Sequence, residues 1–279
     1  MSRVTVVIIT RERHAELAHT LDRLRALPER PPIVVVDHGD GPAEPIPGAR
    51  LLQPGEDAGG AGRTHGVLAA ETPYVAFCDD DSWWEPGSLA RAAELLDAHP
   101  DVALLAAKVL LPGGRIEPTC AAMAASPLPT RPDLPGPRVL GFVACGSVVR
   151  RSAYLAAGGF PPGWGVGGEE LPLATALADR GWELVYVDAL VAQHRPSARR
   201  DPAGRRTIAT RNDLWFAWLR LPTRAAAAAT MRELRRAGTD PRRWAGVVAA
   251  ARHAPWALRA RRPVGPRVAR QLRRLARDQ

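Results

Sequence analysis

The sequence has few cysteines and almost no lysine. Its three cysteines (Cys78, Cys120 and Cys145) are widely spaced and odd in number. They exclude a disulfide framework or a cysteine-rich zinc module, and they are typical of a reducing cytoplasm. Lys108 is the only lysine among 38 basic residues, so arginine carries nearly all the positive charge.

Long apolar runs are also absent. A membrane span needs roughly 20 apolar residues, whereas the longest candidate here, residues 139–149, is about half that length and contains glycine. The N-terminus leads directly into an apolar run, so we expect no signal peptide. Neither a Walker loop nor a Gly-x-Gly-x-x-Gly fingerprint after the first strand is present, which argues against the common nucleotide-binding loops.

The chain has 279 residues, of which 46% are hydrophobic, enough for one large α/β domain with an appendage or for two small domains. Its charge is divided unevenly. Residues 1–194 hold 16 basic and 24 acidic residues, and residues 195–279 hold 22 basic and 5 acidic residues. The sequence therefore predicts an acidic body followed by a strongly basic tail.

Apolar runs alternate with helical patterns in the body. Residues 4–9 and 33–36 are predicted strands, and leucines at helical spacing between them predict a helix over 12–27, which gives a right-handed parallel βαβ unit. Residues 112–137 and 161–170 are rich in proline and glycine and are predicted to be irregular. Further strands are expected over 50–52, 74–78, 102–109, 139–149 and 183–187, with helices over 63–70, 87–98, 152–157, 173–179 and 213–221.

Three adjacent carboxylates, Asp79, Asp80 and Asp81, follow the apolar run 74–78. Ligands of open α/β sheets bind beyond the carboxyl ends of strands, and carboxylate oxygens suit a hard divalent ion that also contacts substrate phosphates. The alternative is a solvated acidic turn that caps the next helix, which Pro86 would help to begin. Taken alone, the cluster favours neither interpretation.

Two other features are compatible with nucleotide binding. Asp37 ends the predicted strand 33–36, where such folds commonly bind a base or ribose, although a capped turn is an equal alternative. Glycines at 59, 60 and 62 precede a helix, where backbone N–H groups and Arg63 suit a phosphate. Each signal is weak by itself.

Taken together, these pieces resemble the family 2 glycosyltransferases, which are inverting enzymes of the GT-A fold. The resemblance extends over roughly residues 1–220 and rests on the order and spacing of its motifs. It implies a Rossmann-like, mostly parallel sheet flanked by helices. The matching segments are residues 4–9 with Thr10 and Arg11, residues 34–37, 59–66, 77–81, Gly158-Gly159-Phe160, Gly168-Glu169-Glu170, His194 and Arg211-Asn212.

The resemblance implies roles for individual residues. Asp37 would contact the base of the nucleotide, Arg63 the nucleotide or its phosphates, and Asp79 the ribose. The nucleotide-sugar-binding residues would be Thr10, Arg11, Asp37, Arg63, Asp79 and Asp80.

For catalysis the resemblance implies Glu170 as the base and a Mn²⁺ or Mg²⁺ ion held by Asp81 and His194. Without it, Glu170 would be interpreted as a solvated residue on a first helical turn, and His194 as an ordinary loop histidine. Trp164, Gly168 and Glu169 would form the acceptor or substrate wall.

Some positions depart from the family pattern. His38-Gly39-Asp40 stands where Asn-Gly-Ser is common, Thr64 replaces the usual Asn, and Pro172 stands where an acidic residue is expected. These departures concern the identity of the sugar and nucleotide more than the reaction. The Gln-x-x-Arg-Trp signature of processive synthases is absent, which favours single transfers.

The basic tail carries apolar residues at helical spacing, which predicts amphipathic helices that lie on an anionic membrane surface. Nucleic-acid binding and a solvated appendage or dimer contact are the alternatives. We expect a nucleotide-binding half (1–110), an acceptor half (111–221) and the tail (222–279).

The expected activity is transfer of one sugar from a UDP-, dTDP- or GDP-linked donor to a glycan or lipid-linked acceptor in cell-envelope synthesis. The expected location is cytoplasmic or peripheral on the inner membrane face, with no nucleic-acid partner. The main alternative is a non-catalytic nucleotide-sugar-binding protein.

Overall fold

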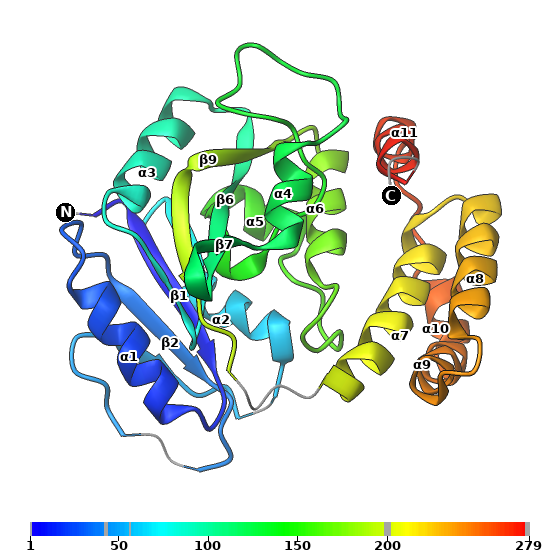
Figure 1. The fold of residues 1–279 in the computed structure, drawn as a ribbon, viewed down its shortest axis with the longest axis horizontal. Helices are drawn as coiled ribbons and strands as arrows, with labels where there is room; N and C mark the ends of the chain where they lie inside the picture. Colours follow the sequence, from blue (N-terminus) through cyan, green and yellow to red (C-terminus); the bar gives the residue numbers. More distant parts are fainter. Residues whose placement is uncertain (1, 42–43, 56, 198–201, 277–279) are drawn as a thin grey trace.

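The computed structural model describes residues 2–41, 44–55, 57–197 and 202–276, with only the backbone described at 202 and 203. A mixed sheet lies at the centre, helices cover it, and a group of helices formed by the C-terminal part of the chain packs beside it (Figure 1). The predicted α/β sheet flanked by helices is confirmed.

The strands run in the spatial order β3-β2-β1-β4-β8-β6-β9-β5, and β7 pairs with β6 outside this path. Their bounds are β1 Val4–Thr10, β2 Ile33–Asp37, β3 Arg50–Leu52, β4 Tyr74–Asp79, β5 Ser82–Trp84, β6 Val102–Leu111, β7 Arg115–Ile116, β8 Ser147–Arg150 and β9 Glu183–His194.

The helices include one turn of 3₁₀ helix, Gly59–Gly62, that leads into α2. Their bounds are α1 His14–Arg25, α2 Arg63–Ala69, α3 Ser88–Ala98, α4 Pro118–Ala124, α5 Arg151–Ala157, α6 Glu170–Asp179, α7 Pro202–Arg220, α8 Thr223–Ala237, α9 Pro241–Arg252, α10 Ala254–Arg259 and α11 Pro266–Leu275.

The first half of the sheet is parallel, as expected. Val7 of β1 lies between Val34 of β2 and Phe77 of β4, and β3 extends the same parallel order. Strands β1 and β2 are buried on both faces and are rich in valine and isoleucine, which is typical of a sheet covered by helices on both sides. Their carboxyl ends therefore meet at one edge of the sheet.

The second half of the sheet is mixed. Strand β8 is antiparallel to both β4 and β6, and β5 is antiparallel to β9, whereas β6 and β9 are parallel. In this half only β6 and β9 pair in parallel, because β8 and β5 run in the opposite direction to their neighbours.

Two predicted elements differ from the structure. The strand expected over residues 139–149 is present only as β8, preceded by a 3₁₀ turn over Ala144–Gly146. A Cβ at Gly146 would lie 2.3 Å from Val109 Cγ2, so the chain turns there in close contact with β6. The excursion over 112–137 contains a short helix, α4, that Glu117 caps by accepting bonds from the Thr119 and Cys120 amides.

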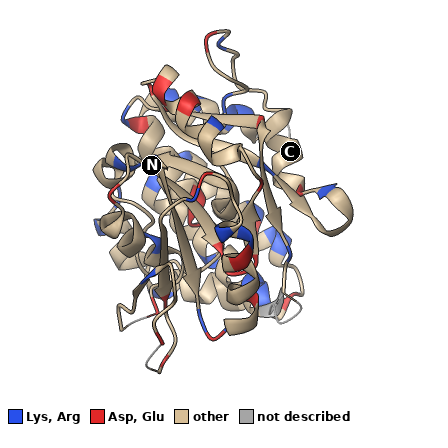
Figure 2. Ribbon diagram, turned by 90° about the vertical axis from the view of Figure 1, so that its left-hand side faces the viewer, with Lys and Arg blue, Asp and Glu red and all other residues tan. Residues whose placement is uncertain are grey.

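The basic tail folds into helices α8 to α11, and residues 223–275 that span them contain 14 arginines and only two acidic residues, Glu233 and Asp240. In the sheet domain, acidic and basic residues are interspersed on the face shown in Figure 2. A small apolar cluster joins α7 to α9 and α10 of the tail around Trp215, and Trp164 and Leu171 of the body pack into the same cluster. No helix among the described residues is long and apolar enough to cross a bilayer.

The last helix, α11, returns to the sheet domain. Val264 and Val268 belong to the main apolar core, and the amide of Gly265 donates to Asp179 at 2.9 Å. The tail expected to begin at residue 222 thus packs on the sheet domain through α11. The division into residues 1–110, 111–221 and 222–279 stays a prediction.

Candidate active site

The three carboxylates lie on the turn between β4 and β5. The amide of Asp79 donates to Ser82 Oγ at 2.8 Å, which closes the turn. Ser82 in turn pairs with His194 at the end of β9. His194 thus ends a strand, contrary to the alternative of an ordinary loop histidine, and the β5–β9 pairing brings it to the acidic turn.

Asp79 is bonded to an arginine from the neighbouring helix. Arg63 Nη2 donates to Asp79 Oδ1 at 2.5 Å, and Arg63 Nη1 lies 3.6 Å from Glu169 Oε1. Burial lowers the pKa of Arg63, but Asp79, Glu169 and Glu170 more than offset this and raise it above its ordinary value. Arg63 therefore stays charged and joins the acidic turn to the start of α6.

Asp80 points into the protein. Its carboxylate accepts a bond from Thr10 Oγ1 at 3.0 Å and another from Arg13, and its backbone oxygen accepts from Thr20 at 2.7 Å. Burial raises the pKa of Asp80 to about 6, although Arg13 and Thr10 act in the opposite direction. Asp80 and Thr10 therefore brace each other, and both still line the adjacent cavity.

Asp81 is almost fully buried and contacts His194. Its Oδ1 lies 3.2 Å from His194 Nε2, and its Oδ2 accepts from the Ser197 amide at 3.1 Å and lies 3.4 Å from Arg13 Nη1. The structure thus brings together the two residues predicted to hold a metal ion.

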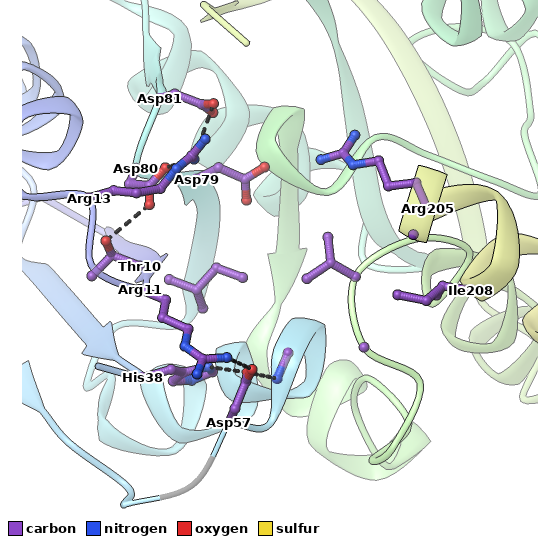
Figure 3. A pocket seen from close by; sticks show the side chains of 15 residues that line it. Thr10, Arg11, Arg13, His38, Asp57, Asp79, Asp80, Asp81, Arg205 and Ile208 are labelled. Atoms are coloured by element: carbon purple, nitrogen blue, oxygen red, sulfur yellow. Dashed lines mark hydrogen bonds and ion pairs between the residues drawn. The ribbon is translucent and has the colours of Figure 1, made fainter. Parts of the chain in front are cut away.

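A cavity of about 470 Å³ opens beside the carboxylates. Arg11 and His38 both contact Asp57 on the far side of this cavity, with His38 Nδ1 3.3 Å from Asp57 Oδ1. From the opposite wall, Arg205 of α7 extends toward the carboxylates (Figure 3). Because arginines and carboxylates line the cavity, it suits a polar, charged ligand. Its lining residues are Ile9, Thr10, Arg11, Arg13, His38, Asp57, Gly59, Asp79, Asp80, Asp81, Gly165, Val166, Gly204, Arg205 and Ile208.

Asp37 lines a neighbouring cavity of about 600 Å³. It accepts a bond from the Gly39 amide at 2.9 Å, so part of its carboxylate is used in the turn that follows β2. Thr10 lines both cavities, which therefore adjoin each other at the end of β1.

A third cavity, of about 270 Å³, contains the predicted catalytic residue. It is lined by Glu170, Asp79 and His194, and it shares Asp79 and Arg205 with the 470 Å³ cavity. The acidic turn, the histidine and the predicted base thus face one connected space.

The two adjacent glutamates at the start of α6 have different environments. Glu169 is buried, accepts a bond from the Gly167 amide at 2.5 Å and is paired with Arg63. Glu170 is partly exposed and forms no ion pair among the described residues. Although the residue is partly exposed, the enclosure of its carboxyl group by protein raises the pKa of Glu170 to about 8, and the negative charge of Glu169 acts in the same direction. Of the two, Glu170 is therefore the group available to accept a proton.

The expected substrate wall is only partly found. Gly168 lines the cavity of Glu170, but Trp164 is 3% exposed and packs against Trp215 with ring centroids 5.9 Å apart. Its backbone oxygen accepts bonds from Arg211 and Asn212, so Trp164 anchors the glycine-rich loop to α7 and does not line the cavities. Glu169 also lines the cavity of Glu170, although it is buried and paired with Arg63.

The glycines before α2 have a packing role. A Cβ at Gly60 would lie 2.5 Å from Glu169 Oε1, and one at Gly62 would lie 2.2 Å from His38. The Gly60 amide donates to the Gly165 oxygen at 2.8 Å. This amide is therefore used in joining two loops, whereas the sequence suggested a contact with phosphate.

The donor set fits a divalent cation. One ligand atom each of Asp79, Cys145 and His194 lies within 4.8 Å of the others, and Asp81 contacts the same histidine. Carboxylate and imidazole are suitable ligands for Mn²⁺, so the residues present fit the expected ion.

Sequence reasoning missed five residues at the site. Arg13 lay in a polar segment with no periodic signal, and Cys145 lay inside an apolar run. Only His38 had a motif signal, since it follows Asp37 where the family commonly has Asn-Gly-Ser. The five are Arg13, His38, Asp57, Cys145 and Arg205.

Residues 5–155 match the family model described as Glycosyl transferase family 2. This segment contains β1 to β8 and all three carboxylates. No significant match was found among curated proteins.

Solved structures with the same fold are glycosyltransferases. GalNAc-T7, solved with UDP, GalNAc and Mn²⁺, has a TM-score of 0.61 at 12% identity; 80% of this chain is covered, and the chain spans 49% of that protein. The mannosyltransferase PcManGT from Pyrobaculum calidifontis, solved with GDP-Man and Mn²⁺, has a TM-score of 0.58 at 18% identity, covering 91% and 87% of the two chains. TarS from S. aureus, solved with UDP-GlcNAc, has a TM-score of 0.53 at 18% identity, covering 76% and 65%.

Proposed function

The chain belongs to glycosyl transferase family 2, and we propose that it moves one sugar from a nucleotide-diphosphate donor to an acceptor hydroxyl with inversion at the anomeric carbon. The observation that carries this proposal is the pair of connected cavities that share Asp79 and Arg205. The larger cavity has the charged lining that a nucleotide diphosphate needs, and the smaller one contains a carboxylate with a raised pKa.

The donor would lie across both cavities. The nucleotide occupies the space near Thr10 and Asp37, where the two larger cavities adjoin. The diphosphate lies between the acidic turn and Arg205, whose guanidinium supplies a charge-assisted contact from α7. The sugar then extends past Asp79 toward Glu170.

Glu170 is the proposed catalytic base. Its carboxylate accepts the proton of the acceptor hydroxyl while that oxygen attacks the anomeric carbon, and a single displacement of this kind inverts the configuration. Arg63 and the Gly167 amide hold Glu169 in place, so that Glu169 supports the start of α6 without taking part in the proton transfer.

A divalent cation, Mn²⁺ or Mg²⁺, would be held by Asp81 and His194 with Asp79 beside them. When bound, the ion neutralises charge on the leaving diphosphate. The neighbours that carry Mn²⁺ with UDP or GDP-Man support this assignment by analogy of fold.

The proposed acceptor is a glycan or lipid-linked sugar of the cell envelope, and the proposed location is the cytoplasmic face of the membrane. Support comes from residues 223–275, which span helices α8 to α11 and carry 14 arginines. On their surface Trp244 and Trp256 are each 43% exposed. Exposed tryptophan among arginines is typical of a helix surface that lies on anionic lipid.

The test is incubation of the purified chain with UDP-, GDP- and dTDP-sugars, with and without Mn²⁺, and detection of free nucleotide diphosphate. Turnover with one donor class, together with NMR of the product's anomeric proton, would establish both transfer and inversion. Donor binding without any release of nucleotide diphosphate would instead support the alternative of a non-catalytic nucleotide-sugar-binding protein.

A further inference from the structure

A further cavity of about 270 Å³ lies within the C-terminal group of helices and shares no lining residue with the cavities of the candidate active site. We call it the tail pocket, and the side chains around it include Trp215 and Trp218 of α7, Thr230 of α8, Val247 and Ala251 of α9, and Leu258 of α10. Thr230 supplies its only hydroxyl, which accepts from Trp218 Nε1 and donates to the Ala226 oxygen, both at 3.0 Å. Since an apolar cavity of about 150 Å³ already takes up a small hydrocarbon, the tail pocket suits a hydrocarbon chain.

The helices that form the tail pocket also expose apolar side chains to solvent. Leu258 is 55% exposed although it lines the pocket, so the apolar lining continues onto the surface. An exposed apolar patch of this kind marks a site for a partner or a lipid. Of the eight large apolar side chains exposed among the described residues, five lie on α8 to α10, namely Met231, Trp244, Val248, Trp256 and Leu258.

The same helices are strongly basic. Residues 223–259, which span α8 to α10, hold eight arginines and two acidic residues, so their net charge is +6. A second copy of this chain would therefore bring like charges together at this surface. A nucleic acid would neutralise the arginines but has no hydrocarbon chain for the pocket. An amphiphile with a hydrocarbon chain and an anionic headgroup matches both features.

The tail pocket is joined to the active site by α7. Ala209 of this helix lines the cavity of Glu170, and Trp218 follows it by nine residues, about 14 Å along the axis at 1.5 Å per residue. Trp215, between these two positions, lines the tail pocket and packs on Trp164 of the glycine-rich loop. A molecule somewhat longer than this distance therefore spans both cavities.

Arg211 provides a positive charge between the two cavities. Its guanidinium carbon lies 4.3 Å from the centroid of the Trp215 ring, and its Nη2 donates to the Trp164 oxygen and to Asn212. No carboxylate of the described residues is paired with it. An arginine without a carboxylate partner, beside an apolar pocket, suits a phosphate.

We propose that the tail pocket binds the hydrocarbon chain of the acceptor, in which a phosphate links this chain to the sugar that receives the transferred unit. The phosphate lies beside Arg211, and the sugar enters the cavity of Glu170. This inference rests on the proposed function, since it names the class of the acceptor. Its tests measure binding without donor or metal, so failure of the sugar transfer and failure of the pocket give separate results.

The first experiment is calorimetry of the full-length chain with dodecyl phosphate, below the concentration at which this probe forms micelles. We expect one saturable site per chain. Ala251→Phe places a ring in the pocket from an exposed position on α9 and should weaken binding at least about tenfold, since each methylene excluded from an apolar site lowers affinity about fourfold. Absence of a saturable site in the wild type would overturn the proposal.

Ala245→Phe is the matched control, because Ala245 is also exposed on α9 but lies outside the pocket. It should bind the probe like the wild type, and equal losses in the two variants would contradict the pocket as the binding site. A second readout does not depend on the folding of Ala251→Phe. The probe 12-bromododecyl phosphate should quench tryptophan fluorescence less in Trp218→Phe than in Trp244→Phe, which changes a tryptophan outside the pocket, and equal quenching would overturn the site.

The headgroup is tested with dodecyl maltoside, which has the same chain but no charge. It should bind at least about tenfold more weakly than dodecyl phosphate, because hydrogen bonds to a charged group are the stronger ones. Arg211→Gln keeps a donor for the Trp164 oxygen but loses the charge, so it should bring the two affinities together. Equal affinities in the wild type would overturn the phosphate assignment.

Lipid of the bilayer is the alternative source of the chain. If acyl chains of the membrane filled the pocket, Ala251→Phe would co-sediment with anionic vesicles less than Ala245→Phe, and this result would overturn the assignment to the acceptor. We expect the two variants to co-sediment equally.

Discussion

His194 Nε2 lies 3.2 Å from Asp81 Oδ1, although β4 and β9 are far apart in the sequence and are not neighbours in the sheet. The contact exists because the short strand β5 leaves the acidic turn and pairs with the end of β9. A carboxylate and an imidazole from two distant segments are thereby presented together, which is the condition for one ion to use both.

The first prediction concerns this pair. Asp81→Asn keeps the size of the side chain and an acceptor for the Ser197 amide, but removes the charge. Donor affinity should then lose its dependence on Mn²⁺ in isothermal calorimetry, since a neutral amide is a weak metal ligand. Asp80→Asn is the matched control, because Asp80 is bonded to Thr10 and Arg13 and should alter stability without removing the Mn²⁺ dependence. Unchanged Mn²⁺-dependent affinity in Asp81→Asn would exclude Asp81 as a ligand.

The second prediction separates the two glutamates. Glu170→Gln cannot accept a proton, so turnover should fall by about 10²–10⁴ while donor affinity stays near normal. Glu169→Gln weakens a buried pair with Arg63, so it should lower the free energy of unfolding by about 1–3 kcal/mol with a smaller effect on turnover. Steady-state kinetics and thermal unfolding of both variants provide the check. The reverse pattern would make Glu169 the base.

The third prediction is a pH dependence. The pKa of Glu170 is raised to about 8, so the ionised base becomes less abundant as pH falls below that value. In the free enzyme kcat/KM should therefore rise about tenfold per pH unit up to about 8 and then level off. A profile flat between pH 6 and pH 8, measured at saturating Mn²⁺, would be incompatible with Glu170 as the base.

The raised pKa of Glu170 also makes stability depend on pH: stability should fall with rising pH, whereas kcat/KM should rise. Because the folded state holds a proton on Glu170 that the unfolded chain releases above about pH 4.5, the free energy of unfolding should decrease as pH rises from about 4.5 to about 8. Glu170→Gln cannot titrate and should reduce this slope. Denaturant unfolding at several pH values compares the two proteins.

The fourth prediction concerns Arg205. Its guanidinium extends from α7 into the cavity of the carboxylates, opposite Asp79 (Figure 3). A charge-assisted contact to a diphosphate contributes about 1.5–3 kcal/mol, so Arg205→Ala should weaken donor affinity about 10–100-fold. Arg206 is the adjacent control, since it is 58% exposed and lies 3.6 Å from Asp240, outside the cavity. Equal effects of the two substitutions on fluorescence-detected donor binding would remove Arg205 from the site.

The fifth prediction tests the helical surface. Full-length protein should co-sediment with anionic but not neutral vesicles and should dissociate at high salt, because each arginine near anionic lipid contributes about 1 kcal/mol. Reversing two exposed charges, Arg252→Glu with Arg259→Glu, should weaken partitioning by at least about tenfold.

The control has the same net charge change elsewhere, at Arg91 and Arg115, both exposed and outside α8 to α11. Similar losses from both double variants would indicate a general charge effect and not a docking surface. Charge reversal is preferable to a cut after Leu221, because the cut would remove Val264 and Val268 from the main core.

Much of the fold was predictable because local patterns agree with it. Strands β1 and β2 are buried on both faces, which matches their continuous valine-rich runs. Helix α1 is buried on one face, which matches the helical spacing of its leucines. The run at 139–149 gave the wrong length for β8, since an apolar stretch indicates burial but not where a strand begins. The apolar spacing of α11 indicated one buried face, but not that the sheet domain would cover it, and Val268 of this face belongs to the main core.

Some residues of the candidate site were also predictable from the sequence, and others were not. The carboxylates and Glu170 were assigned through the resemblance to the family, since their local patterns left alternatives open. Trp164 was assigned to a substrate wall because of the many glycines around it, but its ring packs on Trp215. Arg13 and Cys145 act through contacts that only the folded chain creates, so no local pattern could identify them.

The pairing of Ser82 with His194 also bears on the order in which the protein folds. Strands β1 to β4 are joined by contacts close in the sequence and can associate early, whereas β5 must wait for β9, which comes much later in the chain. Contacts between distant segments form slowly because a long loop must close first. During synthesis the acidic turn would therefore leave the ribosome long before its histidine. Asp81 and His194 would therefore come together only when β9 has joined the sheet.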